Sequence, residues 1–561
     1  MNTIKYLKYL AVSLLLVAGF ASCSDDDNLG DAPRLFRPIA KLTQDGTRNN
    51  LKATWTRLGG ATGYQYELYQ LVTDSTEITD GLQPLFTDTI EDTEIMFTSL
   101  SWDERYILKI RSVGSNIEAS QYYETDYTTL SYPTALNTVR TIDNAALVTW
   151  VDPTTRGQEL YTMFVVTGED GTVLEYEVTD EENAELQKTI EGLSPETTYT
   201  LRAYYGDEQT VTTYQGRQVF TTRAEEDYDA EYGSNRIDLR DMDVDALDNI
   251  MDMINDGGAV ILKGGAKYSL NGTTFDKSVI IRTGLSLEGN AIIVVEGAIN
   301  APGGTTIDKW HFIELDFVYK DINSAGFATS PIEFMKQSGF NANMGGGQVI
   351  NLDQVGSTIN EVIFEDCNIT YFRGVVRIKD ENNLTITSVS FNKCTLDGIG
   401  SQGIVTTDNR STNAISNVSF EDCTLSNVII LVDFRSNRLG KANTTITDCT
   451  FCYASHPGTT QMMRLAESDV VTIQNTIFGP SIGENNYEAG ESSALRSSGV
   501  VSASNSYKTN FEYSSSNYGI DGLNSLNGTD TDVFEDPTNG NFTLIDSSIS
   551  RSVGATKWRA E

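Results

Sequence analysis

The sequence predicts an all-β protein in which two β-sandwiches precede a right-handed, single-stranded parallel β-helix. Three observations carry this prediction. A segment of about 95 residues occurs twice in the first half of the chain, a six-residue pattern then recurs every 26 to 29 residues, and apolar and polar residues alternate in both regions. Alternation with a period of two is typical of half-buried strands, and a short repeat of strands and polar turns is typical of a solenoid.

The first 22 residues have the pattern of a signal peptide. Lys5 and Lys8 precede an apolar run over residues 10–20, and two small residues follow directly before Cys23. The run is short for a membrane span, and a cysteine at this place is where signal peptidase II would cleave and a lipid would be attached. We therefore expect Cys23 to be the lipidated first residue of the mature chain. A secreted form without lipid is the alternative.

An acidic linker over residues 23–32 follows the predicted anchor. Its start, Ser24-Asp25-Asp26-Asp27, resembles the surface-export signal of Bacteroidetes lipoproteins. That resemblance implies a protein held by lipid in the outer membrane and facing the outside of the cell. A hydrated tether is the simpler interpretation of the three aspartates, and the two interpretations are compatible.

The charge balance excludes some partners. The chain has 40 basic and 78 acidic side chains, a net charge of −38. Removal of the signal peptide takes away two lysines and no acid, so the mature chain carries 38 − 78 = −40. Such a chain repels nucleic acid and anionic headgroups, so we expect no sequence-independent binding to either.

A tryptophan and a tyrosine mark equivalent places in the two copies of the duplicated segment. Trp55 and Tyr106 belong to the first copy, and Trp150 and Tyr199 belong to the second. Each lies in a stretch where apolar and polar residues alternate, so its side chain is expected on the buried face of a strand. We interpret these aromatic residues as core residues rather than as a ligand site.

The segment around Tyr199 resembles the tyrosine corner of fibronectin type III modules. It has the pattern Leu-x-Pro-x-Thr-x-Tyr, beginning at Leu193, and in such a corner the phenol hydroxyl binds the preceding connection. Trp102 replaces the proline in the first copy. The resemblance implies two fibronectin type III-like modules, at residues 33–132 and 133–223.

A short helix is expected to cap the β-helix. Residues 224–233 resemble an acidic linker, and the apolar residues after it have helical spacing up to Gly257-Gly258. These residues are Val244, Leu247, Ile250, Met251 and Ile254. A helix at this place would cover the open end of the first coil, although it could also serve only to link domains.

The repeated pattern predicts a parallel β-helix over residues 234–561. Five similar segments begin at Val362, Val389, Val418, Thr444 and Val471. One segment for each coil would place equivalent residues about 4.8 Å apart along the solenoid. Phe364, Phe391 and Phe420 occupy the same place in their segments and are expected to stack inside.

The cysteines of the repeat are expected to be free and buried. They are Cys367, Cys394, Cys423 and Cys449. An exported protein normally pairs its thiols, but side chains stacked in register have parallel Cβ directions that suit a disulfide poorly. Zinc is the alternative, although only His311 and His456 are present as histidine ligands. The same scarcity argues against a catalytic triad that depends on histidine.

Two columns of polar residues follow the cysteine positions when successive coils are aligned. Arg377, Thr406, Asp433 and Arg464 form one column, Lys379, Asp408 and Arg435 form the other, and Arg410, Arg438 and Lys441 lie in adjoining turns. Guanidinium groups are suited to bidentate contact with the carboxylates of a uronic-acid polymer. We therefore predict a ligand-binding strip made by Arg377, Asp408, Arg410, Asp433, Arg435, Arg438 and Arg464. Pairing of Arg with Asp only to relieve repulsion is the alternative.

The C-terminal region carries a family resemblance. A Pro-x-x-Gly-x-Phe-x-Leu segment begins at Pro537, and a Gly-Ala-x-x-Trp tail ends at Trp558. Both resemble the end of pectate-lyase-like β-helix lipoproteins of unknown function from Bacteroidetes polysaccharide-utilisation loci. The resemblance covers roughly the last 320 residues and implies a parallel β-helix fold. Its motifs are structural, so it assigns no catalytic residue to this chain. An outer-membrane glycan transporter complex is a further partner that such a system implies.

Three functions remain open from the sequence. The first is a non-catalytic lipoprotein that binds pectin-like polysaccharide, with the β-sandwiches as a spacer. The second is a calcium-dependent lyase, in which Asp408 and Asp433 would hold calcium and Arg435 or Lys379 would act as the base. The Trp-x-Asp-His and Arg-x-Pro-x-x-Arg runs of pectate lyases are missing from the sequence, which favours binding. The third is an adhesin that binds no sugar.

Hydrolysis would need clustered carboxylates on neighbouring coils. Asp366, Asp422 and Asp448 share one column of the predicted solenoid. Each precedes an inward cysteine, so we expect all three to face solvent beside a turn.

Overall fold

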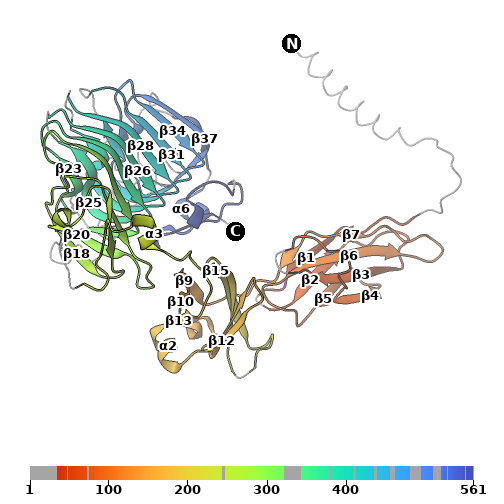
Figure 1. The fold of residues 1–561 in the computed structure, drawn as a ribbon. Coiled ribbons are helices and arrows are strands. Elements are labelled where there is room, and N and C mark those ends of the chain that lie inside the picture. The colour runs from red at the N-terminus through yellow and green to blue at the C-terminus, as the bar shows by residue number, and fades with distance from the viewer. Residues whose placement is uncertain are drawn as a thin grey trace, which may run out of the picture. The chain divides into compact units, whose positions relative to one another are not determined.

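A computed structural model gives the fold of the chain. It describes residues 34–46, 48–72, 75–206, 208–242, 247–320, 331, 343–379, 382–408, 412–434, 439–454, 461–480, 494–509, 520–526, 528–549 and 551–559. The chain divides into two compact units, Met1–Arg223 and Ala224–Glu561 (Figure 1). Within the described residues, no helix is long and apolar enough to cross a bilayer.

The first module is a sandwich of two antiparallel sheets. One sheet has the order β1 (Ala40–Gln44), β2 (Leu51–Trp55) and β5 (Glu94–Phe97). The other has the order β4 (Phe86–Ile90), β3 (Gly63–Gln70), β6 (Arg105–Val113) and β7 (Tyr123–Glu124), with β8 (Thr128–Thr129) also paired to β6.

The second module repeats this topology. Its three-stranded sheet has the order β13 (Gln187–Glu191), β10 (Ala145–Trp150) and β9 (Leu136–Thr141). Its four-stranded sheet has the order β12 (Val173–Glu177), β11 (Met163–Gly168), β14 (Thr198–Tyr204) and β15 (Tyr214–Thr221). Two short helices, η1 (Pro153–Arg156) and α2 (Asp180–Glu185), lie in its connections. The two modules are therefore fibronectin type III-like β-sandwiches, as predicted.

The predicted core tryptophans and tyrosine corners are present in both modules. Trp55 is 7% exposed and Trp150 is 3% exposed. The Tyr199 hydroxyl accepts a hydrogen bond of 2.8 Å from the backbone N–H of Ser194, and the Tyr106 hydroxyl donates one of 3.0 Å to the backbone carbonyl of Ser101. Each phenol therefore ties its strand to the residue five positions before it.

The predicted cap is present, but its helix is shorter than expected. Only α4 (Ile250–Met253) is helical in the described part, and Val244 lies outside the described residues. Leu247 and Ile254, on either side of α4, are buried in the same apolar core as the coils. The segment is therefore a cap whose apolar side chains close the core, while its backbone is mostly extended or turned.

The segment predicted as an acidic linker packs on the first coils. It contains α3 (Tyr228–Tyr232), and β16 (Arg236–Asp238) follows it. Glu226 forms an ion pair with the buried guanidinium of Arg282, and the Tyr228 ring lies 5.3 Å from the same guanidinium. The second unit therefore begins at Ala224, ten residues before the expected start at 234.

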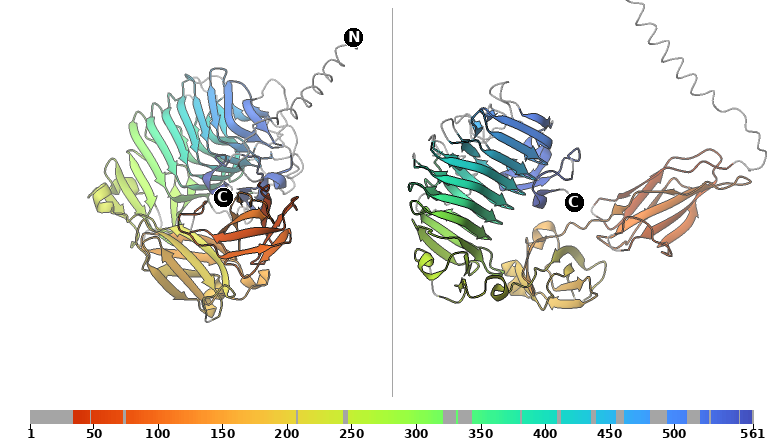
Figure 2. Two further views of the ribbon diagram at one scale, coloured as in Figure 1. Left: turned by 90° about the vertical axis from the view of Figure 1, so that its right-hand side faces the viewer. Right: turned by 45° about the horizontal axis from the view of Figure 1, so that its top comes forward.

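The rest of the second unit is a parallel β-solenoid of about eight turns, whose stacked coils are visible in Figures 1 and 2. Its first strands are β17 (Gly258–Leu262), β18 (Lys267–Asn271), β19 (Val279–Thr283), β20 (Ala291–Gly297), β21 (Thr306–Ile313), β22 (Leu315–Tyr319), β23 (Gln348–Leu352) and β24 (Thr358–Glu365). The central strands are β25 (Asn368–Ile378), β26 (Thr385–Asn392), β27 (Thr395–Thr407), β28 (Ala414–Glu421), β29 (Thr424–Val428), β30 (Val432–Phe434) and β31 (Asn443–Thr447). The last strands are β32 (Thr450–Cys452), β33 (Gln461–Arg464), β34 (Val470–Gln474), β35 (Ile477–Phe478), β36 (Ala494–Arg496), β37 (Val500–Lys508) and β38 (Asp521–Ser525).

The register predicted from the repeat is confirmed. Phe364 pairs with Phe391, and Phe391 pairs with Phe420, on successive parallel strands. Their ring centroids are 5.0 and 5.1 Å apart, with planes within 4° of parallel. All three are fully buried. The phenylalanines therefore form one continuous stack inside the solenoid.

The residue before each ladder cysteine turns the chain at a corner. Asp366, Lys393, Asp422 and Asp448 all have positive φ, between 50° and 54°. This left-handed conformation is unfavourable for most L-residues, and aspartate tolerates it better than most. The three aspartates therefore lie at a stacked corner, and Asp366 is exposed there, as predicted. The expectation that all three face solvent is wrong for Asp422 and Asp448, which are half-buried because the tail binds them through the N–H of Thr556 and the guanidinium of Arg559.

The cysteine ladder is free and buried, as predicted. Cys367, Cys394, Cys423 and Cys449 form no disulfide and have no exposed surface. The Cys394 thiol lies 3.3 Å from the backbone carbonyl of Phe364 on the preceding coil. Burial raises the pKa of Cys394 and of Cys449, which keeps both thiols protonated. No group of three or more His, Cys, Asp or Glu side chains in the described ranges is placed to hold a metal ion.

The C-terminal tail folds back along the side of the solenoid. Its elements are α6 (Asp530–Val533), β39 (Phe534–Asp536), η4 (Pro537–Asn539), β40 (Asn541–Leu544) and η5 (Thr556–Trp558). Phe534 and Leu544 join Ile429 and Cys452 in a second apolar cluster. The Pro-x-x-Gly and Gly-Ala-x-x-Trp motifs therefore cover a lateral face of the coils.

Candidate functional site

The first predicted polar column is confirmed in its register. Arg377 on β25 pairs with Thr406 on β27, Thr406 pairs with Asp433 on β30, and Asp433 pairs with Arg464 on β33. Asn351 on β23 extends the column by one coil. Parallel strands lie about 4.8 Å apart. The column is therefore a line of polar side chains that runs along the solenoid axis.

The second predicted column is supported by its backbone hydrogen bonds. The N–H of Lys379 donates to the Leu352 carbonyl at 2.8 Å, and the N–H of Asp408 donates to the Ile378 carbonyl at 3.0 Å. The same bond on successive coils places Lys379 and Asp408 at equivalent positions. Arg435 lies outside the described residues, as do Arg410, Arg438 and Cys23.

Two arginine–aspartate pairs involve these columns, one that joins the first column to the second and one within the first. The Arg377 guanidinium contacts the Asp408 carboxylate through Nη2 and through Nε, the latter at 3.4 Å. The Arg464 guanidinium lies 3.2 Å from the Asp433 carboxylate. The Asp433 side chain is only 4% exposed, whereas that of Asp408 is 30% exposed. The Asp433 pair is therefore buried and structural, and the Asp408 pair lies nearer the surface.

The Arg377 side chain retains hydrogen-bonding capacity. A guanidinium carries five N–H donors, and the contacts with Asp408 use two of them. Among the described residues, the Arg377 guanidinium makes no other hydrogen bond. An anionic or hydroxylated ligand could therefore bind Arg377 without displacing Asp408.

The structure describes three of the four residues predicted for catalysis or calcium binding, which are Lys379, Asp408 and Asp433. Of the two predicted bases, only Lys379 lies in the described ranges. Asp408 and Asp433, the predicted calcium ligands, are each engaged by an arginine. Calcium binding by these two carboxylates stays a prediction.

Sequence reasoning missed a partly buried carboxylate at Asp397. It pairs with Thr370 on one side and with Ser426 on the other. Its Oδ1 atom accepts hydrogen bonds from the Ser426 hydroxyl at 2.8 Å and from the Asn427 amide at 2.6 Å. Burial raises the pKa of Asp397 to about 6, although these hydrogen bonds oppose the shift. The sequence does not indicate this site, because a single aspartate is common in a repeat of polar strands. Only the strand register shows that Ser426 and Asn427 lie beside Asp397.

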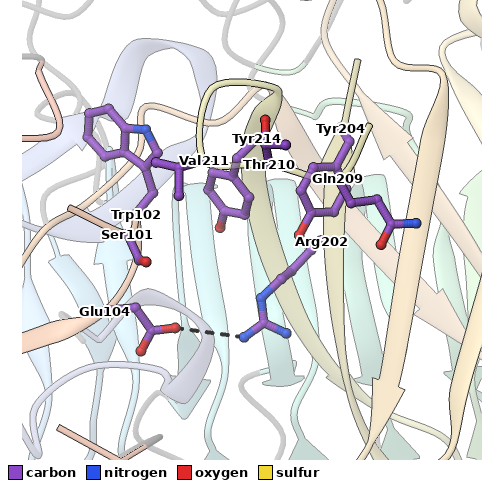
Figure 3. A pocket seen from close by; sticks show the side chains of 9 residues that line it. All are labelled: Ser101, Trp102, Glu104, Arg202, Tyr204, Gln209, Thr210, Val211 and Tyr214. Atoms are coloured by element: carbon purple, nitrogen blue, oxygen red, sulfur yellow. Dashed lines mark ion pairs between the residues drawn. The ribbon is translucent and has the colours of Figure 1, made fainter. Parts of the chain in front are cut away.

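A pocket of about 190 Å³ lies within the first unit (Figure 3). It is lined by Ser101, Trp102, Glu104, Arg202, Tyr204, Gln209, Thr210, Val211 and Tyr214. Trp102 packs edge-to-face on Tyr132, with centroids 5.1 Å apart, and Tyr132 packs in the same way on Tyr214 at 5.5 Å. Tyr204 lies 5.7 Å from Tyr214. One wall of the pocket is therefore aromatic.

The opposite side of the pocket is polar. Glu104 and Arg202 form an ion pair of 3.9 Å, drawn as the dashed line in Figure 3. The Tyr214 hydroxyl donates to the Asp103 carboxylate, and burial, followed by the Asp103 charge, raises the pKa of Tyr214. The sequence offered one signal for this pocket, which is Trp102 in place of the proline of the second copy.

Comparisons with known proteins identify no family for the chain. No family model and no curated protein matches it. Among solved structures, a two fibronectin type III domain segment from chicken tenascin has 11% identity and a TM-score of 0.16, and the match covers 34% of this chain and 100% of that one. The chicken CNTN1 FN1–FN3 domains have 15% identity and a TM-score of 0.14, covering 34% of this chain and 69% of that one. Scores this low carry no argument, so the β-sandwiches are assigned from their strand pairing.

Proposed function

We propose that this protein is a cell-surface lipoprotein that binds a pectin-like, uronate-containing polysaccharide through the polar columns of its β-solenoid. Lipid on Cys23 would anchor the chain in the outer membrane, and the two β-sandwiches would act as a spacer. The bound polymer would then pass to an outer-membrane glycan transporter complex. The enzyme and adhesin alternatives of the sequence are tested by the same experiment.

The observation that supports this proposal most is the column of Asn351, Arg377, Thr406, Asp433 and Arg464 on successive coils. Asn351, Arg377 and Arg464 are partly exposed and offer hydrogen-bonding groups along the solenoid axis, whereas Thr406 and Asp433 are buried between them. A polysaccharide also presents polar groups at a regular spacing along its length. A linear polymer that lies along the column could therefore bind several coils at once, and such contacts gain from their multiplicity.

Arg377 supports a uronate rather than a neutral polymer. Its guanidinium has unused donors in a chain that is otherwise strongly acidic. Paired donors of a guanidinium match the two oxygens of a carboxylate. A polymer with one carboxylate on each sugar would therefore be selected over a neutral one of equal length.

Affinity electrophoresis of residues 24–561 tests this proposal. The chain is run through gels that contain polygalacturonate, or neutral dextran as the matched polymer, in the presence of calcium. We expect retardation by polygalacturonate alone. In parallel, the ultraviolet absorbance of unsaturated uronate is followed in solution, and an increase would show a lyase instead. Equal mobility in both gels, without absorbance, would contradict glycan binding of this class.

A further inference from the structure

We propose that the pocket at Trp102 is a second ligand site, separate from the solenoid columns, and that it binds one neutral sugar ring in the pyranose form. The pocket joins an aromatic wall to a carboxylate–guanidinium pair (Figure 3). This is the arrangement by which a sugar is held, because one face of the ring is apolar and its rim carries hydroxyl groups.

The aromatic wall is built to keep its shape. Trp102, Tyr132 and Tyr214 pack edge-to-face in sequence, at interplanar angles of 87° and 84°. Tyr214 is 8% exposed, and its hydroxyl is fixed by Asp103. Trp102 is only partly buried. A rigid aromatic surface is therefore present before a ligand arrives, which reduces the entropy lost on binding.

The polar side matches a pair of neighbouring hydroxyl groups. The Glu104 carboxylate accepts hydrogen bonds and the Arg202 guanidinium donates them. Their separation of 3.9 Å is long for an ion pair, and their side chains are 20% and 27% exposed. A sugar hydroxyl can donate to the first group while its neighbour accepts from the second. Gln209 and Thr210 line the same pocket and add further donors and acceptors.

The size and the charge of the pocket select the ligand class. Pockets for drug-sized ligands occupy roughly 300–1,000 Å³, so about 190 Å³ suits a single ring rather than a peptide. Aromatic residues also bind quaternary ammonium groups, but Glu104 and Arg202 form an ion pair without net charge. The pair therefore gives neither a cation nor an anion a net attraction, while a neutral pyranose can use both its donors and its acceptors.

Fluorine NMR of the full chain labelled with 5-fluorotryptophan tests this site. The chain has five tryptophans, and the resonance of Trp102 is assigned as the one lost in Trp102→Phe. Galactose is the probe, and choline and galacturonate are run beside it. We expect galactose to shift the Trp102 resonance in a saturable way while the Trp150 resonance, from the core of the second module, does not move.

Two pocket variants and one control decide the outcome. Glu104→Gln and Arg202→Gln should each weaken galactose binding at least five-fold, and Arg48→Gln, which removes an exposed arginine elsewhere in the unit, should leave it unchanged. An unmoved Trp150 resonance shows that each variant is folded. The proposal is overturned if galactose fails to shift Trp102, if the shift survives in both pocket variants, or if only choline produces it.

Discussion

The indole N–H of Trp558 donates a hydrogen bond of 2.8 Å to the hydroxyl of Thr424, a residue 134 positions earlier in the chain. The neighbouring Lys557 reaches Thr395 at 2.9 Å, and the N–H of Ala555 reaches the Thr450 hydroxyl at 2.9 Å. Thr395, Thr424 and Thr450 stack in register on three successive coils. The tail therefore binds a column of hydroxyl groups and joins several coils.

Loss of the Trp558–Thr424 bond should destabilise the solenoid. A hydrogen bond between side chains contributes about 1 kcal/mol, so Trp558→Phe and Thr424→Val should each lower the free energy of unfolding by about that much. The double variant should lose less than the sum of the two. Thr387→Val, at an exposed position of β26, is the matched control. Strictly additive losses in urea titrations would contradict this coupling.

The ladder thiols should react only after unfolding. Cys367, Cys394, Cys423 and Cys449 are free and fully buried. Maleimide should therefore label none of them in the native protein and all of them in urea without a reducing agent. Mass spectrometry after proteolysis counts the labels. Thiols that stay blocked in urea would show disulfides that the fold does not contain.

The pH dependence of stability should carry the signature of Asp397. This carboxyl ionises near pH 3.8 in the unfolded chain and near pH 6 in the fold. Between these values the folded state binds more protons than the unfolded state, so the free energy of unfolding falls as the pH rises from about 4 to about 6. Asp397→Asn keeps an oxygen that can accept the hydrogen bonds from Ser426 and Asn427. Because the amide does not ionise, the variant should not show this decrease in the free energy of unfolding.

The difference in stability between Asp397→Asn and the wild type should therefore grow toward neutral pH. We expect a change of about 1–2 kcal/mol between pH 4.5 and pH 7.5, after allowance for partial exposure of the side chain. Urea unfolding at the two pH values measures it. A difference that is the same at both would show that Asp397 titrates normally.

The second unit should fold alone if it begins at residue 224. A fragment of residues 224–561 keeps Glu226 beside Arg282, and a fragment of residues 234–561 leaves the Arg282 guanidinium without that partner. Removal of one member of a buried ion pair costs roughly 3–5 kcal/mol. The shorter fragment should therefore melt at a lower temperature by circular dichroism. Equal melting temperatures would show that residues 224–233 are only a linker.

The repeat made much of the solenoid predictable. Phe364, Phe391 and Phe420 identify one position of successive coils and fix the register of the strands that hold them, because equivalent residues of a parallel solenoid stack. The polar column needs a separate alignment of the following strand, since Arg377 lies 377 − 364 = 13 residues after its phenylalanine and Thr406 lies 406 − 391 = 15 residues after its own.

Features without a period could not be predicted in this way. The contact of Trp558 with Thr424 joins distant segments, and nothing in the local pattern of either residue indicates the other. The Trp102 pocket needs Arg202 from the other module, so only tertiary structure brings it together. The partners of Asp397 likewise lie on the next coil. Long-range contacts between residues at non-equivalent positions are therefore the features of this protein that the sequence does not predict.

Titration of residues 24–561 with oligogalacturonate by calorimetry tests the central claim most directly. Arg377→Gln should weaken binding about ten-fold or more, because charge-assisted hydrogen bonds contribute about 1.5–3 kcal/mol. Asp408→Asn should bind as tightly as the wild type or more tightly, since Arg377 is then freed, and Arg48→Gln should not change the affinity. Wild-type affinity in Arg377→Gln would contradict the account and leave the Arg377–Asp408 pair as a structural ion pair.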